Sequence, residues 1–323
     1  MEQSDDGGSR LNHSGLSSEA TQNILFAWLF CCIITHGSDM TEDMQPFRLT
    51  LVQTTSSNRH EDNIALLDEI GAQAVDTNSN FIALPEVFGM MNRDFKTTRQ
   101  LVVPAEQDPV IRACQKLAAQ LDLWIHLGST PVLGQSKFRN HSALIDKGGS
   151  IVAQYDKIHL FDIQLQGQKP TGESTRFEPG QALSLVTTPF APIGLTICYD
   201  LRFPHVFRRL AQAGCLVCFV PSAFTVATGR AHWEVLLRAR AIENGMWIVA
   251  AAQVGRHADG RETWGHSIIV SPWGEVICDL GGERATQRTV EIDPEEAIKA
   301  RQQIPSLLHD RSFELTRIES GKL

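Results

Sequence analysis

The chain has 323 residues, of which 42% are hydrophobic and 20% are charged, a composition typical of a globular protein with a sizeable core. Its net charge of −8 and its lack of a long basic stripe argue against a nucleic-acid partner, because phosphate binding needs clustered Lys and Arg. Seven cysteines without regular spacing exclude a disulfide framework and indicate a reducing compartment, the cytoplasm, with the mitochondrion left open.

Residues 1–46 differ in composition from the rest of the chain. They carry seven acidic side chains and one basic one, together with an apolar run at residues 24–34. That run is far shorter than the roughly 20 residues that span a bilayer, and it lacks the flanking residues of a signal or transit peptide. We therefore predict a poorly ordered extension over 1–46, no stable membrane insertion, and a single domain over 47–323.

The first half of that domain alternates short apolar runs with amphipathic segments. The apolar runs predict strands at residues 49–53, 81–84 and 124–129, and the segments with helical spacing predict helices at 63–75 and 110–121. Residues 142–146 and 151–155 predict a hairpin, with Gly148 and Gly149 at its turn because glycine tolerates a tight reversal.

The second half repeats this alternation. We predict strands at 193–198, 216–220, 247–252 and 267–271, and helices at 206–213 and 231–244 that end at Gly214 and Gly245. Arg238 and Arg240, on the second of these helices, are predicted to be surface charges. Alternating elements of this kind predict an α/β domain in which helices pack on largely buried sheets.

Cofactor and metal signatures are missing from the sequence. Neither Gly-rich phosphate-binding fingerprint occurs, and the eleven histidines form no metal-binding motif. We therefore expect no cofactor and no metal site.

Three polar residues follow predicted strands and have complementary chemistry: Glu86, Lys157 and Cys198. Each has an ordinary alternative reading, since a cysteine in an apolar strand is most often a small buried residue and a Glu or Lys at a strand end is often solvated. Together, at the strand ends where α/β sheets assemble their sites, a thiol, a carboxylate and an amine predict an amide-cleaving enzyme.

The segments around these residues form three motif blocks, at 85–88 (Pro-Glu-Val-Phe), 155–160 (Tyr-Asp-Lys-Ile-His-Leu) and 198–204 (Cys-Tyr-Asp-Leu-Arg-Phe-Pro). In their residues and order they resemble the nitrilase superfamily of carbon–nitrogen hydrolases, and the resemblance extends from residue 47 to about residue 310. It implies that 47–323 is a carbon–nitrogen hydrolase domain with a four-layer α-β-β-α sandwich, and that the protein is a homodimer. It also implies that Glu173 is a further catalytic residue, which would otherwise pass for a loop carboxylate.

Further blocks are similar to the deaminated-glutathione amidase branch of this superfamily: residues 221–224, 228–244, 251–257, 265–267 and 272–274. Other branches share these blocks in part. The resemblance implies hydrolysis of deaminated glutathione to 2-oxoglutarate and cysteinylglycine, a metabolite-repair reaction. Two features depart from this resemblance: the N-terminal extension, and Arg230 at a position where proline is expected. We expect the change at Arg230 to alter the loop beside the pocket.

The chemistry that the resemblance implies agrees with the properties of the side chains. A thiol with a pKa near ~8.5 is mostly neutral at about pH 7 and needs a base, the role expected for Glu86. Lys157 and the backbone N–H next to Cys198 would stabilise the oxyanion that forms, and Glu173 would orient Lys157. The product of the attack is a thioester, which water hydrolyses with Glu86 again acting as base.

A substrate acyl group that carries a carboxylate needs a cation and hydroxyl donors. Our candidates for this small-molecule contact are Tyr199, Arg202, Phe224, Thr225 and Thr228. For Arg202 a structural salt bridge with Asp200 is an equal alternative.

Three other functions stay open at this point. One is an omega-amidase acting on 2-oxoglutaramate or another short linear amide. The second is an inactive interaction or scaffold protein, which would need none of Glu86, Lys157 and Cys198. The third is a redox-sensing protein, which predicts a sulfenic acid on Cys198 and no turnover.

Overall fold

The structure is a computed structural model that describes residues 44–164 and 171–318. Most of the predicted N-terminal extension lies outside these residues. The helices are α3 (His60–Asp76), α4 (Phe95–Leu101), α5 (Pro109–Leu121), α6 (Pro204–Gln212), α7 (Val226–Asn244) and α8 (Glu295–Gln303), with short 3-10 helices at η1 (Ala105–Gln107), η2 (Glu173–Thr175) and η3 (Cys198–Arg202). Among the helices described, none combines the length and the apolarity needed to cross a membrane.

Most strands belong to two large sheets. The first has the order β17 (Thr286–Ile292), β1 (Phe47–Gln53), β2 (Phe81–Ala83), β3 (Trp124–His126), β5 (Phe138–Ile145), β4 (Thr130–Leu133), and β6 (Ile151–Asp156) also pairs with β5. The second has the order β16 (Val276–Asp279), β15 (Ile268–Val270), β12 (Trp247–Ala250), β11 (Val217–Phe219), β10 (Pro192–Leu195), β9 (Ser184–Thr187). Two small antiparallel pairs are β7 (Asp162–Ile163) with β8 (Thr171–Gly172), and β13 (Val254–Arg256) with β14 (Glu262–Trp264).

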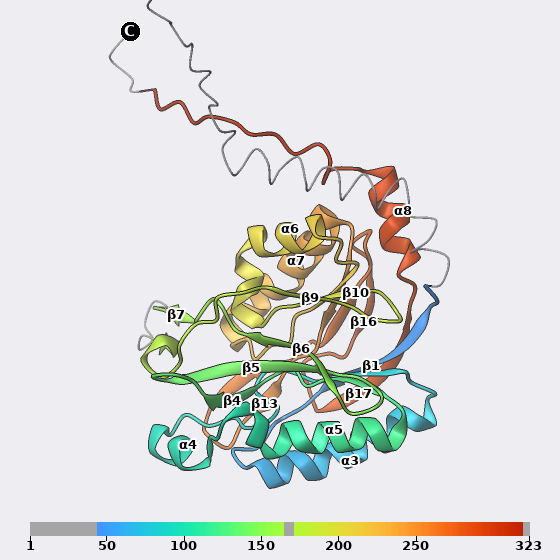
Figure 1. The fold of residues 1–323 in the computed structure, drawn as a ribbon. Coiled ribbons are helices and arrows are strands. Elements are labelled where there is room, and N and C mark those ends of the chain that lie inside the picture. Colours follow the sequence, from blue (N-terminus) through green and yellow to red (C-terminus); the bar gives the residue numbers. More distant parts are fainter. Residues whose placement is uncertain (1–43, 165–170, 319–323) are drawn as a thin grey trace, which may run out of the picture. The chain divides into compact units, whose positions relative to one another are not determined.

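The two large sheets lie face to face between two layers of helices. Helices α3 and α5 cover the outer face of the first sheet, and α6 and α7 cover the second (Figure 1). Aromatic side chains fill the space between the sheets, where Phe81 of β2 stacks on Phe219 of β11 with ring centroids 5.2 Å apart. The predicted four-layer α-β-β-α sandwich is confirmed.

Each sheet has a parallel centre built from β-α-β units. Strands β1, β2 and β3 run parallel in the first sheet, and β10, β11 and β12 run parallel in the second. Parallel neighbours require crossover connections, which place helices over the sheet and bury its strands. Every residue of β2, β3, β11 and β12 is accordingly buried, as the apolar runs predicted.

Two predicted elements have different limits in the structure. The strand expected at 124–129 ends at His126, and residues 130–133 form the separate strand β4. The helix expected to start at residue 231 begins five residues earlier, so Thr228 and Arg230 lie in α7. The prediction that Arg230 alters a loop beside the pocket is therefore wrong, because Arg230 is in a helix. Thr228 and Gly229 are weak helix formers, so the sequence pattern did not indicate that the helix begins at Val226. Gly229 is needed there because a Cβ would lie 2.3 Å from the Trp264 side chain.

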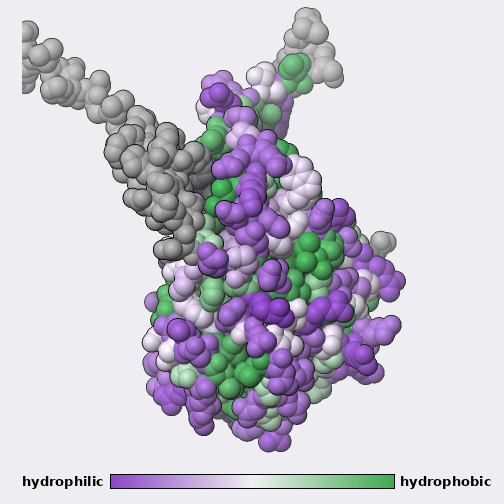
Figure 2. Space-filling view, turned by 90° about the vertical axis from the view of Figure 1, so that its right-hand side faces the viewer, coloured by the Kyte–Doolittle hydropathy of each residue, from purple (hydrophilic) through white to green (hydrophobic). Residues whose placement is uncertain are grey.

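The surface of the molecule is mainly hydrophilic, with hydrophobic residues gathered into separate patches on the face that Figure 2 shows. Large apolar side chains with more than half of their surface exposed in the described ranges include Val235 and Ile242 on α7 and Trp273 after β15. Scattered apolar side chains are usual on a monomer surface, whereas grouped ones indicate a contact surface.

Candidate active site

Glu86, Lys157 and Cys198 all follow strands, as predicted, but they come from two sheets. Glu86 follows β2 and Lys157 follows β6 in the first sheet. Since β6 is antiparallel to β5 and β5 is antiparallel to β3, strands β6 and β2 run the same way and both residues leave the sheet at one edge. Cys198 follows β10 of the second sheet. The three side chains therefore meet between the two sheets and not at the edge of one.

Cys198 stands at a sharp turn between strand and helix. The strand β10 ends at Leu195, and Cys198 begins η3 with a φ of +49°, which is unusual for a residue other than glycine. Its N–H donates a hydrogen bond to Pro221 O at 2.9 Å, which fixes this backbone conformation. Strained conformations of this kind persist where surrounding contacts hold them, and here the turn presents the thiol toward the cavity described below.

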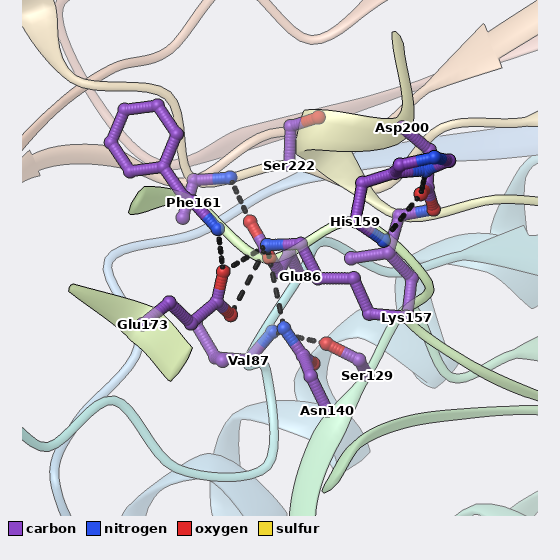
Figure 3. A network of polar contacts seen from close by, with 12 residues as sticks. Glu86, Val87, Ser129, Asn140, Lys157, His159, Phe161, Glu173, Asp200 and Ser222 are labelled. Atoms are coloured by element: carbon purple, nitrogen blue, oxygen red, sulfur yellow. Dashed lines mark hydrogen bonds and ion pairs between the residues drawn. The ribbon is translucent and has the colours of Figure 1, made fainter. Parts of the chain in front are cut away.

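Glu86 is a buried carboxylate with three hydrogen-bond donors. Its Oε1 accepts from Lys157 Nζ at 2.8 Å and from Asn140 Nδ2 at 2.9 Å, and its Oε2 accepts from the backbone N–H of Ala223 at 2.7 Å (Figure 3). Only 4% of the residue is exposed. Each of these three contacts donates to a carboxylate oxygen, and together they fix the orientation of the Glu86 side chain.

The backbone around Glu86 is held as firmly as its side chain. Val87 has a φ of +51°, a strained value for a β-branched residue, and its N–H donates to Ser129 Oγ at 2.8 Å. The carbonyl of Glu86 accepts a hydrogen bond from Gln253 Nε2 at 3.0 Å. These contacts preorganise the carboxylate and leave it little freedom to turn away from the site.

Lys157 lies between two carboxylates. Its Nζ is 2.8 Å from Glu86 Oε1 and 2.9 Å from Glu173 Oε2, and Figure 3 shows the three side chains pointing toward one another. Glu173 belongs to η2 and also accepts the backbone N–H of Phe161 at 2.6 Å. Burial lowers the pKa of Lys157, but the negative charges of Glu173 and Glu86 outweigh that effect and hold the pKa well above its usual value. Lys157 is therefore an ammonium ion at neutral pH.

The surroundings of Cys198 favour its uncharged form, whereas those of Lys157 favour the charged form. Burial raises its pKa well above the usual value and the charge of Glu86 raises it further, against the opposing effect of Lys157. Glu86 is also within hydrogen-bonding reach of the thiol. The resting site thus holds a neutral thiol beside a carboxylate, and a thiol in this state would need a base to accept its proton before it could act as a nucleophile.

This protonation state predicts the pH dependence of Cys198 alkylation. Since the raised pKa keeps the thiolate fraction small, the rate of reaction with iodoacetamide is expected to keep rising from about pH 7 to about pH 9 without a plateau. Quantifying the Cys198 peptide by mass spectrometry at a series of pH values measures this rate. A rate that levels off below about pH 7 would show a preformed thiolate paired with Lys157 and contradict this assignment.

Asp200 links the segments that carry Lys157 and Cys198. It is completely buried and accepts hydrogen bonds from Tyr155 OH at 2.7 Å, His159 Nδ1 at 2.7 Å and Ile197 N at 2.9 Å. The sequence analysis missed this network, although Tyr155 and Asp200 belong to two of its motif blocks. Since Asp200 bonds these three residues, the proposed salt bridge between Arg202 and Asp200 is wrong.

Replacing Tyr155 by phenylalanine is expected to lower the free energy of unfolding by about 1–3 kcal/mol, because a buried Asp200 oxygen loses a donor. Chemical denaturation of the intact protein measures this difference. Val152→Ala, a change at a more exposed position of the same strand, is the control and is expected to shift stability by less than about 1 kcal/mol. Equal midpoints for the Tyr155→Phe protein and the unmodified protein would show that the hydroxyl does not support the site.

Arg240 also supports the catalytic turn, contrary to the prediction of a surface charge. The residue is only 5% exposed, and its Nε and Nη2 donate to the carbonyl of Leu201 at 3.1 and 2.8 Å. This carbonyl lies near the end of η3, where helical acceptors lack partners within the helix. Arg238, on the same helix, has half of its side chain exposed, as predicted.

A cavity of about 190 Å³ opens beside these groups. Glu86, Lys157, Glu173 and Cys198 all line it, and so do four of the five predicted substrate contacts, Tyr199, Phe224, Thr225 and Thr228. The hydroxyls of Thr225 and Thr228 are 2.8 Å apart.

The fifth predicted contact, Arg202, is not among the lining residues. Its guanidinium carbon lies 5.9 Å from the Tyr199 ring centroid and 5.7 Å from that of Phe224, and its Nη2 is 3.2 Å from His232 Nδ1. Arg202 thus contacts the two rings that line the cavity and not the cavity itself.

Besides Asn140, four further polar residues that the sequence analysis missed line the same cavity: Asn92, Arg93, Arg176 and Arg261. They come from the loop before α4, the end of η2 and the turn between β13 and β14. No motif of the sequence marks these positions.

Within residues 44–164 and 171–318, no three His, Cys, Asp or Glu side chains are grouped so that they could hold a metal ion.

The chain is similar to known proteins over most of its length. A family model described as carbon-nitrogen hydrolase matches residues 48–302. The deaminated glutathione amidase of Bos taurus is 40% identical over 271 residues, which cover 81% of this chain and 81% of the relative.

Two solved structures are also similar. The crystal structure of the C. elegans NitFhit protein aligns with a TM-score of 0.76 and 33% identity, covering 83% of this chain and 66% of that one. A glutamate-to-glutamine mutant of an amidase from Nesterenkonia sp. AN1 aligns with a TM-score of 0.67 and 25% identity, covering 80% of this chain and 98% of that one. In the latter structure acrylamide has been added to the active-site cysteine.

Proposed function

Because the chain belongs to the carbon-nitrogen hydrolase family, we propose that it is an amidase that converts deaminated glutathione to 2-oxoglutarate and cysteinylglycine through a thioester on Cys198. The observation that carries this proposal is the cavity in which a carboxylate, an ammonium group and a thiol meet. A relative that shares 40% of its residues is named for the same substrate.

In the acylation step, Glu86 accepts the proton of Cys198 while Sγ bonds to the amide carbon of the substrate. The carbonyl oxygen then carries a negative charge, which the Lys157 ammonium stabilises together with the N–H of Tyr199, a residue in the first turn of η3. Protonated Glu86 passes its proton to the amide nitrogen as the C–N bond breaks. Cysteinylglycine leaves, and the 2-oxoglutaryl group stays on sulfur.

In the deacylation step, a water molecule occupies the place of the departed amine. Glu86 takes a proton from this water, the hydroxyl bonds to the thioester carbon, and the C–S bond then breaks. The proton returns to the sulfur and 2-oxoglutarate is released. Glu173 takes part by position: its two oxygens lie 2.9 and 3.2 Å from Lys157 Nζ and fix the direction of the ammonium group.

The acyl group contacts the wall formed by Tyr199, Phe224, Thr225 and Thr228. Hydroxyl groups at Thr225 and Thr228 can donate to the acyl carboxylate, and the Phe224 ring packs on the methylene groups. Arg202 does not contact the acyl group itself. Its guanidinium group contacts the Tyr199 and Phe224 rings and holds them in the cavity wall.

The test is the release of 2-oxoglutarate from deaminated glutathione and, in parallel, from 2-oxoglutaramate. We expect a higher kcat/KM for deaminated glutathione. The Cys198→Ala protein, purified in the same way, controls for contaminating amidases. A higher kcat/KM for 2-oxoglutaramate would move the function to omega-amidase, and no turnover of either substrate would support the scaffold or redox-sensing alternative.

We further propose a homodimer that forms through α7. Val235 and Ile242 are seven residues apart on this helix, so they share one face, and 69% and 55% of their surfaces are exposed. Sedimentation of the intact protein is expected to give twice the chain mass, and an Ile242→Asp variant to give the chain mass. A monomer for the unmodified protein would contradict the dimer.

Residues 47–323 are proposed as the catalytic domain, with 1–46 dispensable for catalysis. A chain that starts at residue 47 is expected to keep kcat within about twofold, which an assay beside the intact protein measures.

The proposed location is the cytoplasm, with the mitochondrion as the alternative, because the five cysteines of the described residues are all free thiols. Cell fractionation distinguishes the two compartments.

A further inference from the structure

A group of cations also lines the cavity. Arg93, Arg176 and Arg261, together with the amide of Asn92, form what we call the arginine subsite. Burial and the charge of Arg261 lower the pKa of both Arg93 and Arg176. The three guanidinium groups line one cavity, and their like charges therefore oppose one another.

The positive charge of this subsite is only partly compensated. Arg261 pairs with Asp259 at 2.5 Å, and the two carboxylates that line the cavity, Glu86 and Glu173, both pair with Lys157. Among the described residues no carboxylate forms an ion pair with Arg93 or Arg176. Arg93 and Arg176 therefore line the cavity without a direct ion pair in the described residues, although the charge of Asp259 acts on both and that of Glu173 acts on Arg176.

Two buried donors of the subsite also lack an acceptor in the described part of the chain. They are Asn92 Nδ2, on a residue that is only 7% exposed, and Arg176 Nε. A buried donor without a partner costs free energy, so such donors usually mark the place of a ligand or water. Both atoms are N–H donors, and the ligand that satisfies them must therefore offer acceptor oxygens.

The position of the subsite identifies the part of the substrate that it contacts. Cys198, Lys157 and Glu86 are buried, whereas Arg93 is exposed and Arg176 and Arg261 are half-buried, so these three arginines are more accessible than the groups around Cys198. In the proposed reaction the amine product departs first while the acyl group remains bonded to Cys198. The leaving arm of the substrate must therefore extend toward the open side, and in deaminated glutathione that arm ends in the glycine carboxylate.

We propose that Arg93, Arg176 and Arg261, with Asn92, bind the terminal carboxylate of the leaving peptide arm and thereby select peptide-like amides over short amides such as 2-oxoglutaramate. This inference rests on the proposed function. Guanidinium groups suit the role because they bind a carboxylate through two parallel N–H···O bonds.

Arg176 also has a structural contact that the test must separate from binding. Its Nη1 and Nη2 donate to the carbonyls of Arg93 and Asn92 at 3.0 and 2.9 Å, which ties η2 to the loop before α4. No hydrogen bond of the Arg93 side chain to another described residue is present, so removing this side chain disturbs the fold least. Arg93→Gln is therefore the primary variant.

The experiment compares deaminated glutathione with its glycinamide, which has the same scissile bond and acyl group but no terminal carboxylate. In the intact protein we expect kcat/KM for the acid to exceed that for the amide by about 10- to 100-fold, the size of a charge-assisted contact. In Arg93→Gln this ratio is expected to fall about tenfold or more through KM, with Arg93→Lys intermediate. Arg112→Gln, on the exposed side of α5, is the control and keeps the ratio.

The outcomes separate this inference from the proposed function. If the intact protein releases 2-oxoglutarate from both compounds without preferring the acid, or if Arg93→Gln keeps the preference, the subsite assignment is overturned and the amidase function stands. If neither compound is cleaved, the proposed function fails. Calorimetry with the Cys198→Ala protein then still decides the inference: tighter binding of the acid than of the amide, weakened by Arg93→Gln, supports it, and equal binding overturns it.

Discussion

Replacing Cys198 by alanine is expected to lower kcat by at least about 10⁴-fold, because no other described group can form the covalent intermediate. Substrate binding should persist, since the lining of the cavity is otherwise intact. Turnover of deaminated glutathione and calorimetric binding, measured on the same preparation, separate the two effects. Cys278→Ala is the matched control, because Cys278 is a free, buried cysteine of β16 outside the cavity, and it is expected to keep kcat within about twofold. A Cys198→Ala protein that kept a tenth or more of the activity would exclude thioester chemistry.

Replacing Lys157 by methionine is expected to lower both activity and stability. Methionine matches the length of the side chain, but Glu86 and Glu173 then lie in a buried site without their shared cation. Removing one partner of a buried ion pair typically costs about 3–5 kcal/mol of unfolding free energy, and removing an oxyanion donor lowers kcat by about 10²- to 10³-fold. Chemical denaturation and steady-state kinetics measure the two effects.

The stabilisation by Lys157 has a defined pH range. Because its pKa is higher in the folded protein than in the unfolded chain, this stabilisation is complete below the unfolded value near ~10.4 and is lost only as the pH rises through the folded value. In the unmodified protein the contribution of the Lys157 charge should therefore be the same at about pH 6 and about pH 8, which chemical denaturation at the two pH values measures.

Two further variants isolate the buried charge. Adding Glu173→Gln to Lys157→Met removes one of the two uncompensated carboxylates, so part of the stability should return while kcat stays low. Lys299→Met breaks an ion pair of similar length with Glu295 that is more than half exposed, and it should cost less than about 1 kcal/mol. Similar losses in Lys157→Met and Lys299→Met would contradict the structural role of the buried network.

The α/β character of the domain could be predicted because its parallel strands leave a local signal, whereas the four-layer sandwich followed from the family resemblance. Both sheets are built from β-α-β units, so buried apolar runs alternate with amphipathic helices along the chain. The start of α7 could not be predicted in the same way. Gly229 lies in the first turns of that helix because Trp264 packs against it, and this is a tertiary contact that no local pattern reveals.

That Glu86, Lys157 and Cys198 would lie together could be predicted for a different reason. Glu86, Lys157 and Cys198 each follow an apolar strand directly or within three residues, so their chemistry is visible beside a structural signal. Their supports were not visible, since Asp200 and Arg240 look like ordinary loop and helix-surface charges until the fold buries them.

The arginines that line the cavity could not be predicted from the sequence either. Arg202 was selected because it lies in a motif block, yet it contacts aromatic rings behind the cavity wall. Arg93, Arg176 and Arg261 line the cavity but are separated by long stretches of sequence, and only the packing of three segments brings them together. Long-range electrostatic groupings of this kind cannot be read from one sequence.

Deaminated glutathione and 2-oxoglutaramate carry the same acyl group, so turnover of either compound by the proposed mechanism passes through one thioester on Cys198. Hydroxylamine tests it most directly, because it competes with water for the thioester and converts the acyl group to a hydroxamate. Deaminated glutathione and 2-oxoglutaramate should then give the same ratio of hydroxamate to 2-oxoglutarate at each hydroxylamine concentration, since both form the same acyl-enzyme. Different ratios for the two substrates, or 2-oxoglutarate without any hydroxamate, would contradict the account.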